Sequence, residues 1–231
     1  MRVLSIVHQS DAGAGVFGEA GEEFATWVPS AAPAPTDGFD AVMIFGGSMH
    51  ADQNDEHRWL APEKDFLREQ LDRGTPMLGV CLGSQLLAEA AGARPQRSDE
   101  PEIGWIDVEF TPEGAADPVL GPLAPSSSLF EWHHYVAPLP PGAVALAHTP
   151  LCVQAFRIEG APAWGLQFHA EVTKRDLWSW LDGWGNSEAV STSLDPERIR
   201  ADSEQRIEPQ NELGRGIARR FLAEAERAAT R

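Results

Sequence analysis

A short apolar run that passes directly into a helix-forming segment constrains the fold of this 231-residue chain most strongly. The run Pro76–Val80 is followed by Cys81 and Gly83, and then by Leu-, Ala- and Glu-rich sequence that stops at Gly92. This order predicts a strand, a very tight turn and a helix. Glycines two positions before and after the cysteine allow backbones to approach, as a sharp strand-to-helix corner requires. The thiol is therefore expected at the N-terminus of a helix.

Two interpretations of Cys81 fit this corner. The positive end of a helix favours a thiolate over a thiol, and a thiolate at neutral pH is a nucleophile. A small cysteine buried at a strand end, without a chemical role, fits the same pattern. Cys81 and Cys152 are too few for a disulfide framework, and neither stands in a metal-ligand spacing. We therefore expect free thiols in a reducing compartment and no metal site.

The charge balance argues against some classes of partner. The chain has 18 Lys and Arg against 35 Asp and Glu, which gives a formal net charge of −17. Binding to nucleic acid through its phosphates, or to an anionic membrane surface, is therefore not expected. No apolar run approaches the ~20 residues of a membrane span, and no leader-like segment is recognisable. The sequence predicts a soluble, cytoplasmic protein with one substantial core.

Strand and helix signals alternate over roughly the first ninety residues, which favours a mostly parallel sheet flanked by helices. Strands are expected at 2–7 and 39–45, and a helix from about Pro62 to Arg73. Glycines after the first strand do not form a phosphate-binding fingerprint, so we expect no nucleotide and no other cofactor. Further on, strand-like runs separated by Pro and Gly predict an antiparallel portion. These runs are 103–110, 128–136, 143–147, 151–158 and 163–168.

Helical signals return toward the C-terminus. Apolar residues at helical spacing predict one helix around Leu177–Trp184 and a final one over Pro209–Ala229. Between them, Asn186–Thr192 is the best candidate for a flexible excursion. We therefore divide the chain into a main domain at 1–185 and a C-terminal helical extension at 186–231 that packs on the same domain. The apolar stripes are interpreted as core-facing surfaces, in preference to partner-binding ones.

A cysteine nucleophile needs a base, a group that orients the base, and donors for an oxyanion. His169 and Glu171 stand two residues apart at the end of the last expected strand, where extended backbone directs both to one side. We expect His169 to pair with Cys81, although a polar loop without a catalytic role fits the same residues. The rivals are His133 and His134, which would point to opposite faces, so that at most one would reach the same pocket. Neither has a carboxylate two residues on.

In this order the motifs resemble the class I (triad) glutamine amidotransferase domain, in the branch of stand-alone proteins not fused to a synthetase. Gly79–Gln85 looks like the nucleophile motif of that family, and Gln167–Glu171 looks like its His-x-Glu motif. The resemblance runs from the first strand to about Leu181 and implies the flavodoxin-like α/β fold of these domains. Shorter agreements lie at Gly46–Gln53, Glu102–Trp105, Trp132-His133 and Gln154–Arg157.

The resemblance implies hydrolysis of the side-chain amide of glutamine with release of ammonia. Cys81 would form a γ-glutamyl thioester, His169 would move the proton, and Glu171 would orient His169. Ammonia would pass to a separate synthetase or acceptor protein, because too few residues follow Glu171 to form one. Substrate contacts are implied for Gly47, Leu82, Gln85, His133 and Tyr135, the first two through backbone N–H groups that hold the oxyanion.

The chain departs from the family pattern in two segments. Ala170 stands where the family usually has proline, and His134-Tyr135 stand where the stand-alone branch reads Gly-Asp. Two bulky rings there change the pocket that holds the α-amino and carboxylate groups, so the substrate is less closely defined than the chemistry. The alternatives are a γ-glutamyl peptide or amine hydrolase with the same triad, and a catalytically silent binding or scaffold protein.

Overall fold

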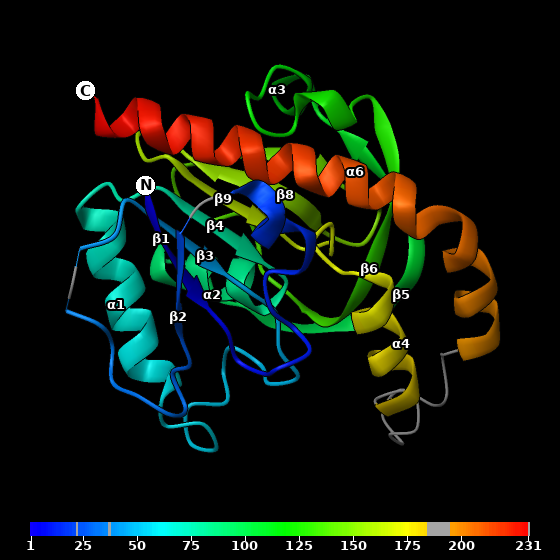
Figure 1. Ribbon diagram of the computed structural model, residues 1–231, viewed down its shortest axis with the longest axis horizontal. Helices are drawn as coiled ribbons and strands as arrows, with labels where there is room; N and C mark the ends of the chain where they lie inside the picture. Colours follow the sequence, from blue (N-terminus) through cyan, green and yellow to red (C-terminus); the bar gives the residue numbers. More distant parts are fainter. Residues whose placement is uncertain (22, 37, 184–194, 231) are drawn as a thin grey trace.

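The structure is a computed structural model that describes residues 1–21, 23–36, 38–183 and 195–230. Within these ranges the strands form one nine-stranded sheet in the order β2-β1-β3-β4-β9-β8-β7-β5-β6, with helices around it (Figure 1). The strands are β1 (Arg2–Ile6), β2 (Glu23–Trp27), β3 (Ala41–Ile44), β4 (Met77–Val80), β5 (Gln96–Phe110), β6 (Ser126–Val136), β7 (Ala143–His148), β8 (Val153–Ile158) and β9 (Ala163–Leu166). The helical elements are η1 (Gly15–Ala20), α1 (Leu60–Asp72), α2 (Leu82–Ala90), α3 (Pro112–Ala115), η2 (Gly121–Leu123), α4 (Lys174–Gly183) and α6 (Pro196–Ala229).

One half of the sheet is parallel and the other half antiparallel. The four pairings from β2 through β1, β3 and β4 to β9 are parallel, and the four pairings from β9 through to β6 are antiparallel. Strands β3, β4 and β9 are buried along their whole length, as parallel strands covered on both faces are. The expected α/β fold with an antiparallel portion is confirmed.

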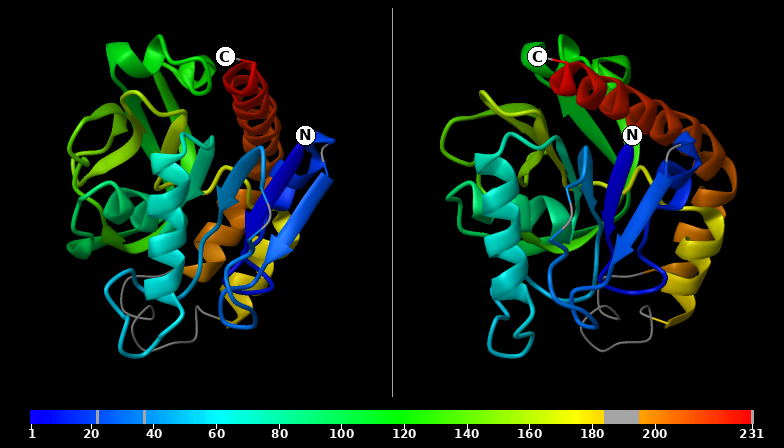
Figure 2. Two further views of the ribbon diagram at one scale, coloured as in Figure 1. Left: turned by 90° about the vertical axis from the view of Figure 1, so that its left-hand side faces the viewer. Right: turned by 60° about the vertical axis from the view of Figure 1, so that its left-hand side comes forward.

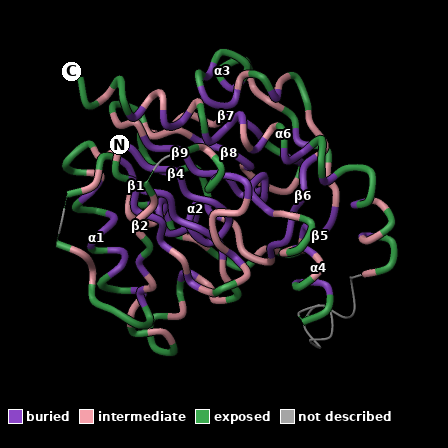
Figure 3. Tube along the Cα trace, viewed as in Figure 1, coloured by how far each residue is buried: buried purple, intermediate pink, exposed green. Residues whose placement is uncertain are grey.

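Alternate residues of the central strands feed two separate parts of the core. Val3 packs into a cluster with Ile217 and Phe221 of α6, whereas its neighbour Leu4 packs into a cluster with Leu67 of α1. Helices α1 and α2 therefore lie on one face of the sheet, and α6 with η1 lies on the other (Figure 2). Buried residues concentrate along the strands between these layers (Figure 3).

Two strand predictions need correction. Strand β2 was not expected, because Glu23–Trp27 lies at the edge of the sheet and is mostly accessible, so it lacks the continuous apolar run of the inner strands. Strand β5 starts at Gln96, although the sequence predicted a start at 103. The earlier part of the strand carries no apolar signal, because its residues are polar and largely exposed. The other strands, and helix α1, fall within two residues of their expected ranges.

The last helix begins at Pro196 and not at Pro209 as expected. Asp195 caps it, accepting a hydrogen bond from the N–H of Arg198 at 3.1 Å, and proline suits the first helical position. Pro209 stands inside the helix on its exposed side, and α6 bends along its length (Figure 1). The segment predicted to be flexible and the boundary at 185/186 lie outside the described residues. None of the helices in the described ranges has the length and apolar character to cross a membrane.

Candidate active site

Cys81 occupies the sharp corner between β4 and α2. It has φ 52° and ψ −112°, and it is the one non-glycine residue of the described ranges with positive φ, a conformation that costs on the order of 1–3 kcal/mol. A Cβ on Gly79 would lie 2.5 Å from the carbonyl oxygen of Gly83, and a Cβ on Gly83 would lie 2.1 Å from that of Ile44. Neither position has room for a side chain, as the sequence predicted.

The His169 ring reaches Cys81 from the segment after β9. The backbone N–H of His169 donates to the carbonyl of Phe130 at 2.8 Å, which fixes the segment against β6. Nδ1 of His169 lies 2.8 Å from Oε1 of Glu171, and both side chains are 3% exposed. The ring lies near Cys81: a Cβ placed on Gly46 would be 3.2 Å from Cε1 of His169 and 3.6 Å from Cβ of Cys81. Trp180 of α4 packs edge-on against the ring at 4.9 Å between centroids. The structure thus brings together the three residues proposed from the sequence.

The surroundings of the His169 ring favour its positively charged form. Burial alone would lower the pKa of His169, but the Glu171 carboxylate and Cys81 outweigh it and hold that pKa well above its usual range. A histidine that holds a proton beside a cysteine can act as the acid–base partner of a nucleophilic sulfur. The arrangement can therefore attack an electrophilic carbon and then donate a proton.

A cavity of about 370 Å³ opens beside the Cys81 sulfur, a volume within the range of small-molecule sites. Apart from His169 and Glu171, every site residue predicted from the sequence contributes to its wall. These residues are Gly47, Cys81, Leu82, Gln85, His133 and Tyr135. The predicted substrate-contacting residues therefore surround one space that includes the proposed nucleophile.

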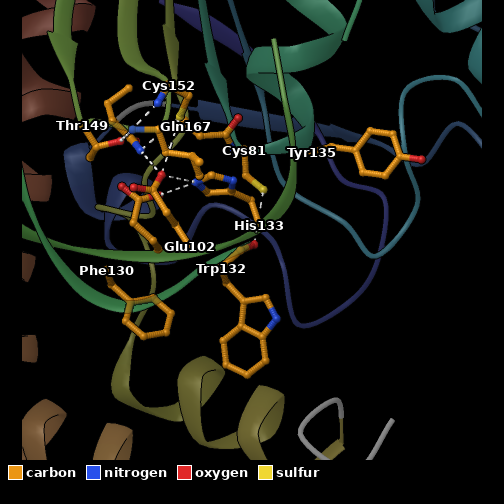
Figure 4. Close-up of polar contacts among 12 residues, drawn as sticks. Cys81, Glu102, Phe130, Trp132, His133, Tyr135, Thr149, Cys152 and Gln167 are labelled. Atoms are coloured by element: carbon orange, nitrogen blue, oxygen red, sulfur yellow. Dashed lines mark hydrogen bonds and ion pairs between the residues drawn. The ribbon is translucent and has the colours of Figure 1, made fainter. Parts of the chain in front are cut away.

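The side chains of Gln85 and Tyr135 shape the wall in different ways. Nε2 of Gln85 donates to the backbone carbonyl of Tyr135 at 2.8 Å and to Oε1 of Gln167 at 3.1 Å. The Tyr135 ring points away from Cys81 (Figure 4) and stacks on His50 with centroids 3.9 Å apart. Burial lowers the pKa of His50, which favours the uncharged form of its ring. Tyr135 thus meets the cavity as part of an aromatic pair.

His133 brings a second positive charge close to Cys81. Its ring lies between Cys81 and the Glu102 side chain (Figure 4), with Nε2 3.2 Å from Oε2 of Glu102 and 3.3 Å from Oε2 of Glu131. Burial would lower the pKa of His133, but the two carboxylates and Cys81 raise it to about 9. Burial raises the pKa of Glu131, and His133 opposes that effect.

The expectation that at most one of His133 and His134 would reach the pocket is wrong. Both contribute to the wall of the cavity. The pairing of β6 with β5 is irregular here: His133 pairs with Glu102 and Tyr135 with Arg97, so residues 98–101 of β5 lie opposite His134 alone. Such a bulge increases the local twist, and strict alternation of the side chains no longer applies.

One group of side chains near the cavity has metal-binding residue types. Atoms of Glu102, His133 and Cys152 lie within 4.8 Å of one another. Nε2 of Gln154 donates to Oε2 of Glu102 at 2.7 Å and reaches Sγ of Cys152 at 3.4 Å, so an N–H donor points into the group. Burial, followed by Glu102, raises the pKa of the Cys152 thiol, which opposes the deprotonation that metal binding needs. These residues suit a hydrogen-bond network and not a cation.

Sequence reasoning missed Gln210, which holds the active-site backbone from α6. Its Oε1 accepts from the N–H of Phe130 at 2.7 Å and its Nε2 donates to the carbonyl of His169 at 3.0 Å. The side chain is 2% exposed. A glutamine on the apolar stripe of a helix was the available signal, because a buried amide requires partners.

Comparisons with known proteins agree with this geometry. The sequence matches the family model of class I glutamine amidotransferases over residues 22–177. It is 28% identical over 183 residues to the glutamine amidotransferase-like protein YfeJ of Salmonella typhimurium, covering 75% of this chain and 77% of that protein. It is 35% identical over 147 residues to a glutamine-hydrolysing GMP synthase subunit from Ignicoccus hospitalis, covering 61% and 71%. Its fold is similar to the crystal structure of a glutamine amidotransferase from Thermotoga maritima, with a TM-score of 0.85 and 27% identity over 96% of this chain and 98% of that one.

Proposed function

Because this chain belongs to the class I glutamine amidotransferase family, we propose that it hydrolyses the side-chain amide of glutamine at Cys81 and releases ammonia. The observation that carries the proposal is that Cys81, on its strained corner, and the His169 ring meet at Gly46, where an added Cβ would lie 3.6 Å from Cβ of Cys81 and 3.2 Å from Cε1 of His169. Glu171 holds that ring at 2.8 Å. A nucleophile, a proton donor and an orienting carboxylate are the groups that amide cleavage through a thioester requires.

The reaction proceeds in two steps. The Cys81 thiolate attacks the γ-carbonyl carbon, the C–N bond breaks, and the His169 imidazolium gives its proton to the departing nitrogen, which leaves as ammonia. Neutral His169 then takes a proton from water, and the resulting hydroxide attacks the thioester. The C–S bond breaks, the product acid loses a proton to water and leaves as glutamate, and the thiolate and the imidazolium are restored. Glu171 keeps Nδ1 of His169 protonated, so that Nε2 is the atom that exchanges protons with the substrate.

Two backbone N–H groups stabilise the oxyanion of both steps in this proposal. Leu82 is the first residue of α2, where backbone N–H groups have no acceptor within the helix and the helix dipole is positive. Gly47 follows β3 and also lines the cavity, where an added Cβ would lie 3.3 Å from Cδ2 of Leu82. Donors of this kind each contribute about 10²–10³-fold to the rate of acyl transfer.

The test is ammonia release from glutamine by the purified chain. We expect ammonia and glutamate in equal amounts, loss of both in Cys81→Ala, and retained activity in the matched control Cys152→Ala. Absence of ammonia from the wild-type chain, both alone and with an extract of the source cells, would refute the proposal.

The cavity also favours a second candidate, hydrolysis of larger γ-glutamyl compounds by the same three residues. Its volume of about 370 Å³ leaves room for a leaving group larger than ammonia. Its wall also offers Arg97 and the His50–Tyr135 stack as contacts for such a group. Comparison of kcat/KM for glutamine with that for γ-glutamyl peptides and amines distinguishes the two. Preference for glutamine over every other compound rules out the second candidate.

We further propose that the ammonia passes to a separate acceptor protein in the cytoplasm. Support comes from relatives that are themselves subunits of GMP synthase, such as that of Ignicoccus hospitalis. A reducing compartment suits the free thiols of Cys81 and Cys152. Glutaminase activity that rises when a cell extract is added would identify a fraction that contains the acceptor.

A further inference from the structure

A buried histidine and glutamate take no part in the mechanism above, although the histidine packs against Gly47 of the cavity wall. His8 follows β1, and Glu63 lies in the first turn of α1. Nε2 of His8 is 2.9 Å from Oε1 of Glu63, and both side chains are 0% exposed. The His8 ring also stacks on Trp59 with centroids 5.5 Å apart. Burial of such a pair carries a desolvation penalty, which further hydrogen bonds must offset.

The other nitrogen of the His8 ring contacts the end of β3. Nδ1 lies 3.0 Å from the carbonyl oxygen of Phe45 and 3.1 Å from that of Gly46. Because a carbonyl oxygen can only accept, Nδ1 carries a hydrogen and donates it. Burial would lower the pKa of His8, but Glu63 and these two carbonyls raise it, which fits a ring that donates from both nitrogens.

The carbonyl of Gly46 belongs to the same peptide unit as the N–H of Gly47. In a trans peptide these two groups lie in one plane and point in opposite directions. A donor that holds the oxygen on the side of His8 therefore directs the N–H to the opposite side. A Cβ placed on Gly46 would be 3.6 Å from the Cβ of Cys81, and Gly47 lines the cavity, so the nucleophile lies close to this unit.

The two glycines make such a restraint necessary. A Gly-Gly peptide has wide conformational freedom, and its plane can rotate more readily than one between residues with side chains. A Cβ on Gly47 would lie 3.1 Å from the Cβ of His8 and 2.7 Å from Sδ of Met49, so the His8 side chain packs directly against this unit.

We propose that His8 and Glu63 are positioning residues that hold the Gly46–Gly47 peptide with its N–H directed at the oxyanion formed on Cys81. Glu63 orients the His8 ring and stabilises its charge, and His8 fixes the Gly46 carbonyl. A positive charge beside that carbonyl also draws electron density from the peptide and makes the N–H a stronger donor. This inference rests on the function proposed above, since it concerns the oxyanion of that reaction.

Two reactions of the same sulfur separate this role from a purely structural one. Glutamine hydrolysis forms an oxyanion, whereas alkylation of Cys81 by iodoacetamide takes place at a saturated carbon and forms none. We expect His8→Leu to lower kcat for glutamine by about 10²–10³-fold, while KM and the rate of Cys81 alkylation stay within about threefold. His8→Gln keeps an N–H donor and is expected to restore part of the lost kcat.

Glu63→Gln provides a second test that retains the side-chain volume, in case His8→Leu does not fold. It removes the charge that orients His8, and we expect kcat to fall by about tenfold or more with alkylation unchanged. The matched control is Asp65→Asn on the same helix, whose side chain is 77% exposed and pairs with Arg68. This control is expected to behave as wild type.

The outcomes discriminate clearly. Wild-type kcat in both His8→Leu and Glu63→Gln, or a parallel fall of kcat and alkylation, overturns the positioning role while the proposed function stands. A wild-type chain that releases no ammonia overturns the proposed function, and the inference with it. A selective loss of kcat with partial recovery in His8→Gln supports the inference.

Discussion

Replacement of Glu171 by glutamine tests the coupling of the active-site charges most sharply. The substitution preserves shape and removes one negative charge 2.8 Å from Nδ1 of His169, in a site where both side chains are 3% exposed. The pKa of His169 is raised in the folded protein, and burial opposes that rise, so loss of the carboxylate lowers the pKa. The imidazolium is then lost at a lower pH than in the wild type.

The size of the effect follows from the geometry. Two unit charges roughly 4 Å apart at an effective dielectric constant of ~20 interact by about 4 kcal/mol. If that energy supports the proton-donating form of His169, its loss corresponds to about a thousandfold in rate. A proton-transfer residue typically contributes 10²–10⁴-fold, so the figure is within the usual range of about two to four orders of magnitude.

The assay is kcat/KM for glutamine as a function of pH. In Glu171→Gln we expect a fall of about a thousandfold near neutral pH and an alkaline limb that moves to lower pH. Activity within tenfold of wild type with an unmoved alkaline limb would show that His169 does not depend on Glu171. The control is Glu204→Gln, a half-exposed carboxylate on α6 that pairs with Lys174 and is expected to leave the profile unchanged.

Three further predictions concern the surroundings of the site. Gln210→Ala leaves a buried N–H and a buried C=O without partners, so thermal unfolding should show a loss of about 1–3 kcal/mol together with a lower kcat; unchanged stability would contradict the role of that side chain. Gly83→Ala should destabilise the fold by about 1–3 kcal/mol or more in denaturant titration, whereas Gly13→Ala, with its nearest neighbour at 4.0 Å, should stay within about 0.5 kcal/mol. Burial raises the pKa of Cys152, so peptide mapping after brief alkylation at neutral pH should find Cys81 modified well before Cys152, and equal rates would argue against a special environment for Cys81.

The fold was predictable where the signal is local. The corner at Cys81 was predictable because two glycines flank the cysteine in the sequence itself. In the structure neither glycine has room for a Cβ. Strand β2 was not, since an edge strand needs a neighbour on one side only and carries no continuous apolar pattern. The last helix is predicted only from about Pro209 because its apolar stripe begins near Leu213, but the cap formed by Asp195 sets the start at Pro196.

The active site was likewise predictable only where its residues are marked by local sequence. Cys81 is marked by the glycines of its own corner, and His169 and Glu171 lie two residues apart, so the sequence shows both motifs and the family resemblance joins them. The contact of His8 with Glu63 joins residues 55 positions apart, and that of Gln210 with His169 joins residues 41 apart. No periodicity or spacing marks such pairs, because only the packed fold brings them together. The irregular pairing that puts His134 in the wall likewise depends on the partner strand.

The most direct test of the account is detection of the covalent intermediate. The chain is mixed with glutamine, quenched in acid within the first turnovers, digested and analysed by mass spectrometry. We predict a glutamyl thioester on the peptide that contains Cys81, none on the peptide that contains Cys152, and its disappearance as glutamate forms. Ammonia release with no adduct on Cys81 at any time, or an adduct on Cys152 instead, would contradict the account.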